Sequence, residues 1–242
     1  MLLPKNKQEE KKRLKLFIAG VGSGNSEFIT IAALNAAKDS DLIIVPRSNM
    51  NNSGMAENII SQFLPEREII PLYFPMTKNE AKRDKIILEQ LEKINSLNTS
   101  QKIFFPVIGD SLLYSTGAYF IQAMKKLFDC EINFIPGISA HSSASALAKR
   151  FLAMKDEIFS IIPGTADPEK IKSALETCDS AAIYKPSALT DIKFLLEYSR
   201  KWEIIRVDYA GIPELEKIFT GYDALNDLNN YMSIILLYRA NI

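Results

Sequence analysis

The sequence contains very little histidine or cysteine. Among its 242 residues, His141 is the one histidine, and Cys130 and Cys178 are the two cysteines. A structural zinc site takes four closely spaced cysteine or histidine ligands, so we expect no metal centre of that kind. Two cysteines are also too few for a disulfide framework in a chain of this size, and we expect both to be reduced thiols in a cytoplasmic protein.

The chain also lacks an excess of charge and any long apolar run. Its 29 lysines and arginines balance its 29 aspartates and glutamates, so the net charge is zero. No long-range attraction then draws the protein to phosphate backbones, and we expect no nucleic-acid partner. No apolar run approaches the roughly 20 residues that cross a bilayer, and we expect no membrane partner. Residues 1–13 are rich in lysine and are expected to form a charged N-terminal arm in solvent.

Apolar residues make up 47% of the chain, and from residue 14 onward their spacing alternates between two periods. Short runs rich in β-branched and aromatic residues predict strands, and longer segments with apolar residues three and four apart predict helices between them. We expect strands at 15–19, 42–46, 68–73, 102–108, 131–135, 158–162, 181–184, 204–208, 216–220 and 232–239. This alternation is typical of an α/β fold in which helices cover parallel strands.

The length of the chain allows one large domain or two modest ones, and we expect two α/β domains. We place the boundary near residues 127–136. This gives an N-terminal α/β domain of 14–130 and a C-terminal α/β domain of 131–242. Neither a flexible linker rich in glycine and serine nor an internal repeat marks the division.

The first of three loops at predicted strand ends is the glycine-rich segment 20–27, Gly-Val-Gly-Ser-Gly-Asn-Ser-Glu. Glycines let a backbone approach a ligand closely, and the start of a helix offers free N–H groups. A dinucleotide fingerprint would need glycine at Asn25 and an acid where the second strand ends in Pro46-Arg47, so an NAD site is disfavoured. The open alternative is a tight turn in which Ser26 caps a helix beside Glu27.

The other two loops follow the predicted strands 102–108 and 131–135. In the first, Gly109 leaves room for a ligand, and Asp110 either accepts hydrogen bonds from that ligand or acts as a turn or capping residue. In the second, small residues after Pro136-Gly137 permit close approach of either a flat ligand or another helix. Ligands of open α/β sheets bind beyond the carboxyl ends of the strands, which favours a binding site at these loops.

Taken together, the three loops resemble those of the tetrapyrrole methylase family, and residues 14–239 fit the resemblance. Further segments resemble the branch of this family that methylates carbon 20 of precorrin-2 or cobalt-factor II. These segments are Phe74-Pro75-Met76-Thr77, Tyr114-Ser115-Thr116, Val207-Asp208-Tyr209-Ala210-Gly211 with Pro213-Glu214, and Tyr231-Met232-Ser233-Ile234-Ile235. The resemblance implies two α/β domains with S-adenosylmethionine bound in the cleft between them, a tetrapyrrole substrate and a homodimer.

The resemblance also implies roles for individual residues. Cofactor contacts are expected at Gly109, Asp110, Leu113, Ser139, Ala140, Tyr184, Ala210 and Gly211. Substrate contacts are expected at Gly22, Ser23, Gly24 and Lys185, and catalytic contacts at Asn25 and Tyr114. Tyr114 and the first loop would orient the macrocycle. Lys185 would pair with a substrate carboxylate, unless it is a solvated lysine at a strand end, and Arg47 is a second candidate for such a carboxylate.

Three positions depart from the family pattern. Family members usually have Pro-Gly-Asp-Pro where this chain has residues 23–26 and Gly-Asp-Pro where it has 109–111, and they often have methionine at Tyr184. Asn25 therefore supplies no carboxylate that could act as a base, although a reduced tetrapyrrole supplies its own electron-rich carbon. Two other functions stay open: a methylase of the same fold acting on another substrate, such as RNA or a protein side chain, and a non-catalytic ligand-binding paralogue. His141 is expected to be a packed helix residue rather than a catalyst.

Overall fold

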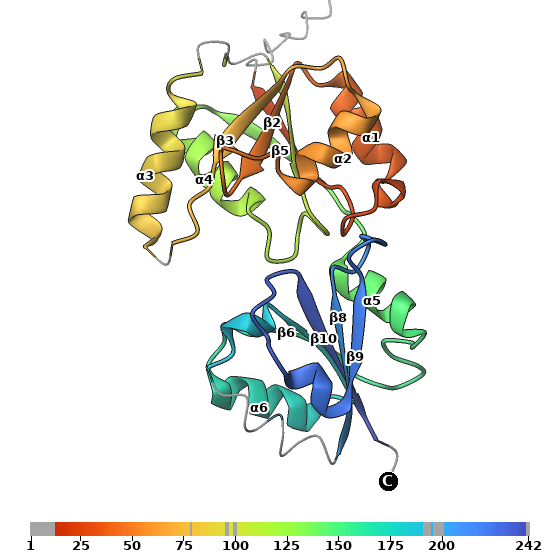
Figure 1. Ribbon diagram of the computed structural model, residues 1–242. Coiled ribbons are helices and arrows are strands. Elements are labelled where there is room, and N and C mark those ends of the chain that lie inside the picture. The colour runs from red at the N-terminus through yellow and green to blue at the C-terminus, as the bar shows by residue number, and fades with distance from the viewer. Residues whose placement is uncertain are drawn as a thin grey trace, which may run out of the picture.

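The computed structural model describes residues 13–77, 79–94, 97–98, 101–190, 195 and 201–240. They form two α/β halves, which lie one above the other in Figure 1, and each half contains one five-stranded sheet. The strand order is β3-β2-β4-β1-β5 in the first sheet and β6-β7-β10-β8-β9 in the second. The expected fold class, a pair of α/β units, is confirmed.

All strands of the first sheet run parallel. They are β1 (Leu14–Gly20), β2 (Leu42–Arg47), β3 (Ile69–Tyr73), β4 (Lys102–Val107) and β5 (Cys130–Ile135). Side chains of β1 alternate between two cores, with Leu16 and Ile18 in one and Phe17 and Ala19 in the other. Helices α3 (Glu80–Leu91) and α4 (Gly117–Leu127) cover the first core, and α1 (Ile31–Asp39) and α2 (Met55–Phe63) cover the second.

The second sheet is mixed. Its strands are β6 (Phe159–Pro163), β7 (Ser180–Tyr184), β8 (Trp202–Asp208), β9 (Lys217–Thr220) and β10 (Ser233–Arg239). The pair β6 and β7 runs parallel, whereas β10 is antiparallel to β7 and β8, and β9 is antiparallel to β8. Helix α5 (Ala140–Ala148) packs against one face, and α6 (Pro168–Thr177) packs against the other. Parallel pairing is therefore complete in the first sheet only.

The chain passes from the first sheet to the second after β5. Strand β5 pairs in register with β1 from Leu14↔Cys130 to Ala19↔Ile135, so it belongs to the first sheet. A boundary between residues 130 and 131 would separate this strand from its hydrogen-bonded partner. We therefore propose a division after Ile135, between β5 and α5. Of the expected arm 1–13, only Arg13 lies within the described residues.

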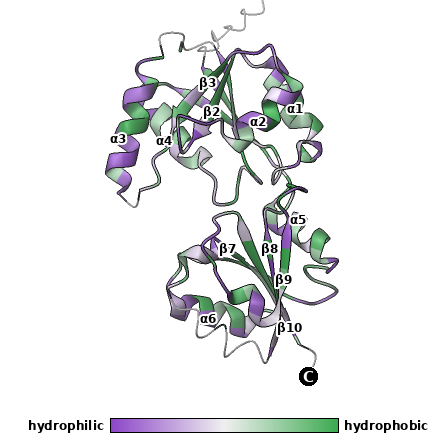
Figure 2. Ribbon diagram, viewed as in Figure 1, coloured by the Kyte–Doolittle hydropathy of each residue, from purple (hydrophilic) through white to green (hydrophobic). Residues whose placement is uncertain are grey.

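The helices show how well apolar spacing locates elements. Apolar spacing predicts one helix over about residues 27–38, but the structure divides this segment into a 3-10 helix, Ser26–Phe28, and α1, which begins after Thr30. The Thr30 hydroxyl accepts a hydrogen bond from the N–H of Ala33 at 3.1 Å and so starts a new helix. The sequence predicts a charged, solvated helix over about residues 79–95, and α3 in this segment has a hydrophilic outer surface (Figure 2). Further 3-10 helices lie at Pro186–Ala188 and Gly221–Leu225. Among the described helices, none combines the length and the apolar character that crossing a membrane requires.

Candidate functional site

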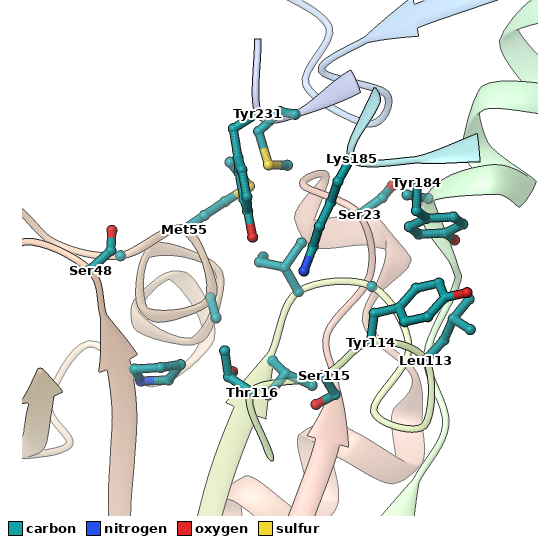
Figure 3. Close-up of a pocket in the computed structure, with 18 of the residues that line it drawn as sticks. Ser23, Ser48, Met55, Leu113, Tyr114, Ser115, Thr116, Tyr184, Lys185 and Tyr231 are labelled. Carbon is teal, nitrogen blue, oxygen red and sulfur yellow. The ribbon is translucent and has the colours of Figure 1, made fainter. Parts of the chain in front are cut away.

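A cavity of about 630 Å³ lies where the two halves meet, at the carboxyl ends of β2, β4 and β7 and beside the start of β10. Open α/β sheets bind their ligands at this edge. Figure 3 shows that both halves contribute to the walls, which include Met55, Leu113 and Tyr114 from the first half and Tyr184, Lys185 and Tyr231 from the second. Neither half alone encloses this space.

Three glycines hold the strand ends next to the cavity in close contact. Gly20 ends β1, Gly109 follows β4, and Gly137 follows β5. A methyl group added to Gly137 would lie 2.3 Å from the carbonyl oxygen of Gly109 and 2.7 Å from the Cα of Gly20. One added to Gly20 would lie 2.4 Å from the same carbonyl oxygen. Any larger residue at Gly20 or Gly137 must therefore move Gly109, which lines the cavity.

The predicted cofactor residues gather at this cavity. Those that line it are Gly109, Leu113, Ala140, Tyr184 and Ala210, and the other three, Asp110, Ser139 and Gly211, are their sequence neighbours. The Asp110 carboxylate accepts a hydrogen bond from the N–H of Leu112 at 2.8 Å, so it serves the turn as well. Both roles that the sequence left open for Asp110 are thus compatible with its position.

The glycine-rich first loop is mainly a contact between the two halves. Ser23 lines the cavity, but Gly22 and Gly24 are not among the residues of its wall. The buried hydroxyls of Ser23 and Ser143 are hydrogen bonded at 2.7 Å, which joins the loop to α5. Gly211 has a φ of +97°, and a methyl group there would lie 2.5 Å from the Ser23 hydroxyl. Of the three substrate contacts predicted for this loop, the structure brings only Ser23 to the cavity.

Asn25 has a local role in the same loop. Its side-chain oxygen accepts a hydrogen bond from the N–H of Glu27 at 2.9 Å and caps the 3-10 helix Ser26–Phe28. The sequence had suggested Ser26 as the cap, but the capping residue is Asn25. Asn25 is absent from the cavity wall. Its catalytic role stays a prediction that no contact in this structure supports.

Tyr114 and Tyr184 form an aromatic contact across the two halves. Their ring centroids are 5.4 Å apart, and both residues line the cavity. Tyr114 has a φ of 50°, a left-handed conformation that costs a residue other than glycine free energy. Burial raises the pKa of the Tyr114 phenol and raises that of Tyr184 to about 12, so both hydroxyls are neutral at physiological pH.

His141 is the hydrogen-bond partner of Tyr184. The Nδ1 atom of His141 lies 2.7 Å from the Tyr184 hydroxyl, and the backbone N–H of His141 donates to the same oxygen at 3.3 Å. His141 is half-buried in α5, as expected of a packed helix residue. Its contact with a cavity-lining tyrosine was not anticipated, because 43 residues separate the two in sequence.

Two cations line the cavity, and their surroundings differ. Arg47 donates two hydrogen bonds to the Glu57 carboxylate, at 2.7 and 2.5 Å, and this pair holds the pKa of Glu57 below its usual range. Glu57 also accepts from the N–H of Gly54, at the start of α2. Within the described residues, no carboxylate forms an ion pair with Lys185, whose side chain extends into the middle of the cavity (Figure 3).

Soft-metal ligands do not gather at this site. Within the part of the chain that the structure describes, no group of three or more histidine, cysteine, aspartate or glutamate side chains is placed to hold a metal ion. Cys130 and Cys178 are both free, and burial raises the pKa of each thiol. The chemistry available at the cavity is therefore that of hydroxyls, one free lysine, small residues and aromatic rings.

A sequence model of the family described as Tetrapyrrole (Corrin/Porphyrin) Methylases matches residues 15–222, which is most of the chain. This chain belongs to the tetrapyrrole methylase family. A relative in Methanocaldococcus jannaschii, named "Probable cobalt-precorrin-2 C(20)-methyltransferase", is 30% identical over 228 residues, which cover 93% of this chain and 96% of the relative. The cobalt-precorrin-2 C(20)-methyltransferase of Salmonella typhimurium is 25% identical over 175 residues, which cover 71% and 72%. The family resemblance is confirmed.

Solved structures have a similar fold. A cobalamin synthesis related protein, CobF, of Corynebacterium diphtheriae superposes with a TM-score of 0.71 at 17% identity, over 94% of this chain and 99% of that one. A uroporphyrin-III C-methyl transferase of Thermus thermophilus, complexed with S-adenosylhomocysteine, gives a TM-score of 0.61 at 12% identity, over 93% and 97%. At these identities the likeness establishes the fold.

Tetrapyrrole methylases use S-adenosylmethionine, and the cavity of this family member fits such a group. Gly109, Ala140 and Ala210 line the cavity with small side chains or none, so a nucleoside can approach the backbone after β4 and β8 and at the start of α5. Leu113 and Tyr184 supply apolar and aromatic surface beside them. Aromatic faces attract ligand cations such as a sulfonium. The small residues and the aromatic surface of the cavity wall therefore fit the family's cofactor.

Several wall residues of this tetrapyrrole methylase had no role assigned from the sequence. Phe74, Met76 and Tyr231 lie in segments that carried the resemblance to the carbon-20 branch, and all three line the cavity. Their position in those segments was the one signal that could have identified them. Glu57 is not a wall residue, but it holds the wall residue Arg47, and no sequence signal marked it, because the pairing depends on the packing of α2 against β2.

Proposed function

We propose that this tetrapyrrole methylase transfers the methyl group of S-adenosylmethionine to carbon 20 of precorrin-2 or of its cobalt-containing counterpart, in cobalamin biosynthesis. The observation that carries the proposal is similarity at 30% identity to a methyltransferase of that name over almost the full length of both chains. The cavity supports it, because Phe74, Met76 and Tyr231, which belong to segments that resemble the carbon-20 branch, line the wall beside the predicted cofactor residues.

The chain's contribution to the reaction is alignment. S-adenosylmethionine supplies an electrophilic methyl group when it is bound. Transfer to a nucleophilic carbon of the substrate would break the bond from methyl to sulfur, leave its electron pair on sulfur, and afterwards release to solvent the proton that the methyl group replaces. Such an in-line displacement needs donor and acceptor about 3 Å apart, and it needs no protein base in the bond-forming step. A site without a carboxylate at Asn25 therefore suits this chemistry.

In this proposal one end of the cavity binds the cofactor and the other end binds the tetrapyrrole. Gly109, Ala140 and Ala210, with Tyr184 beside them, hold the cofactor where the strand ends meet. Tyr114 lies between the two ligands and orients the macrocycle. Lys185 pairs with a carboxylate of the substrate, because it extends into the cavity and its charge is not already compensated as that of Arg47 is.

Binding and turnover test this function separately. We expect titration calorimetry to detect binding of S-adenosylhomocysteine, and we expect methyl-labelled S-adenosylmethionine to transfer its label to precorrin-2 or cobalt-factor II at carbon 20, located by NMR. Transfer to another position or another acceptor would support the alternative of a different methylase. Cofactor binding with no transfer to any tetrapyrrole would support a ligand-binding paralogue. No binding of S-adenosylhomocysteine would overturn the enzyme assignment.

Replacing Lys185 by methionine is expected to raise KM for the tetrapyrrole about tenfold, which is about 1.4 kcal/mol, because a charge-assisted hydrogen bond to a carboxylate is lost. Binding of S-adenosylhomocysteine should change little. The matched control is Lys149→Met, since Lys149 has the same φ of 54° but is exposed at the end of α5, away from the cavity wall. Steady-state kinetics of both variants would decide the point, and equal KM values would remove Lys185 from the substrate site.

We also propose that the protein is a homodimer in the cytoplasm. Edge strand β6 and the segment before it expose large apolar side chains, among them Phe151, Met154 and Ile158. An exposed apolar edge is a common site of association. The free cysteines fit a reducing compartment. Light scattering of the purified chain should give the mass of a dimer, and Phe151→Asp should shift it toward the monomer.

A further inference from the structure

His141 and Tyr184 belong to different elements but form one hydrogen-bonded unit. His141 is the second residue of α5, and Tyr184 is the last residue of β7. The histidine ring also lies against Phe159 of β6, with ring centroids 5.5 Å apart, so it is held from both sides. Tyr184, in turn, faces Tyr114 and lines the cavity. His141 is therefore in direct contact with a ring that lines the cavity.

The Tyr184 hydroxyl has two contacts with His141. The backbone N–H of His141 donates to the phenolic oxygen, and in the tautomer with an unprotonated Nδ1 the hydroxyl proton is donated to Nδ1 at 2.7 Å. An Nδ1 atom that accepts a hydrogen bond carries no proton, which places the ring proton on Nε2 and leaves the imidazole neutral. Burial of the ring lowers the pKa of His141, which favours the same neutral form, while the charge of Asp110 opposes the effect.

We propose that His141 is a positioning residue for the cofactor: as a neutral acceptor it holds the Tyr184 hydroxyl, and thereby the tyrosine ring, against the cofactor end of the cavity. This inference rests on the proposed function, because it presumes that the ligand beside Tyr184 is S-adenosylmethionine. A neutral imidazole also keeps a second positive charge away from a sulfonium. The histidine acts through Tyr184 and does not itself line the cavity.

Protonation of His141 reverses this arrangement. A protonated Nδ1 donates to the phenolic oxygen, so the hydroxyl proton of Tyr184 must turn elsewhere, and a charge appears near the cofactor. The charged and titratable groups that face the pair in the structure are Asp110 and Tyr114, both from the segment after β4. Since the pKa of His141 lies below the ordinary 6.5, cofactor binding should be constant at and above that pH and should weaken as the pH falls through the lowered pKa.

The test measures binding of S-adenosylhomocysteine and of S-adenosylmethionine by calorimetry at about pH 7.5 and at a series of lower pH values that extends below the lowered pKa of His141. His141→Ala should weaken S-adenosylhomocysteine binding about fivefold at the highest pH, the value of one hydrogen bond. His141→Asn keeps an acceptor near the Nδ1 position and cannot titrate, so it should restore most of the affinity and abolish the loss at low pH. Tyr184→Phe should match His141→Ala, and the double variant should be no weaker than either single one.

Thermal melting separates these outcomes from misfolding. If His141→Ala does not fold, the Tyr184→Phe and His141→Asn variants still decide the question. Additive losses in the double variant, or a pH dependence that persists in His141→Asn, would overturn the positioning role. If the unaltered chain binds neither ligand at any of these pH values, the proposed function fails, and this inference fails with it. If the unaltered chain binds and His141→Ala binds equally well, only this inference fails.

Discussion

Gly137→Ala is expected to destabilise the protein by about 3 kcal/mol and to abolish binding of S-adenosylhomocysteine, because overpacking of a tightly packed site costs about 1–3 kcal/mol and this position has rigid neighbours on two sides. The new methyl group would lie 2.3 Å from the Gly109 carbonyl oxygen and 2.7 Å from Gly20. All of these neighbours are backbone, so no flexible side chain can move away. Urea unfolding and calorimetry with S-adenosylhomocysteine measure the two effects.

A glycine elsewhere in the chain provides the control. Gly221 has a positive φ of +58° and no neighbour within 4 Å of an added methyl group. Gly221→Asn should cost less than about 1 kcal/mol, since asparagine tolerates the left-handed conformation. Gly20→Ala should behave like Gly137→Ala, because its methyl group meets the same carbonyl oxygen at 2.4 Å. A Gly137→Ala protein that unfolds and binds like the unaltered chain would show that the three strand ends are free to separate.

The elements of the fold were predictable to within a few residues because burial imposes a period on them. Strand β1 alternates between two cores, and α2 places Ala56, Ile59 and Ile60 on one buried face. The order of strands within each sheet was not predictable in the same way. It depends on contacts such as that between β10 and β7, which pair residues about fifty positions apart. A periodic pattern specifies which face of a strand is buried but not which strand lies beside it.

The location of the site was predictable for a topological reason. Parallel strands present their carboxyl ends at one edge, so loops after β1, β4 and β5 had to meet there. What these loops contact could not be deduced from the same reasoning. Ser23 is hydrogen bonded to Ser143 in the other half of the chain. His141 contacts Tyr184 because α5 packs over the second sheet. Both facts depend on how the two halves pack together.

Glu57→Gln is expected to lower the free energy of unfolding by about 2 kcal/mol, between the 0–1 of an exposed ion pair and the 3–5 of a fully buried one. The side chains of Arg47 and Glu57 are only 18% and 10% exposed, and the carboxylate also caps α2 at Gly54. Because Arg47 lowers the pKa of Glu57, this stabilisation is present above the ordinary 4.5 and is lost as the pH falls through the lowered value. The difference between variant and unaltered chain should therefore shrink in acid.

The matched control for this prediction is Glu89→Gln, which removes the acid of an exposed ion pair between Lys85 and Glu89 on α3. It should change the free energy of unfolding by less than about 0.5 kcal/mol both at neutral pH and in acid. Equal effects of the two substitutions in urea unfolding would mean that solvent screens the Arg47 pair as fully as a surface pair.

Glu57→Gln is expected to weaken the fold but to strengthen binding of the substrate. In the unaltered chain, Glu57 compensates the charge of Arg47, so Lys185 is the cation that remains available to a carboxylate. With glutamine at position 57, Arg47 becomes a second available cation on the wall of the cavity. We therefore expect the folded variant to show a lower KM for a polyanionic tetrapyrrole, by about threefold if one more exposed ion pair forms. A protein that is less stable but binds its substrate more tightly would show that Glu57 serves the fold and limits the positive charge of the site.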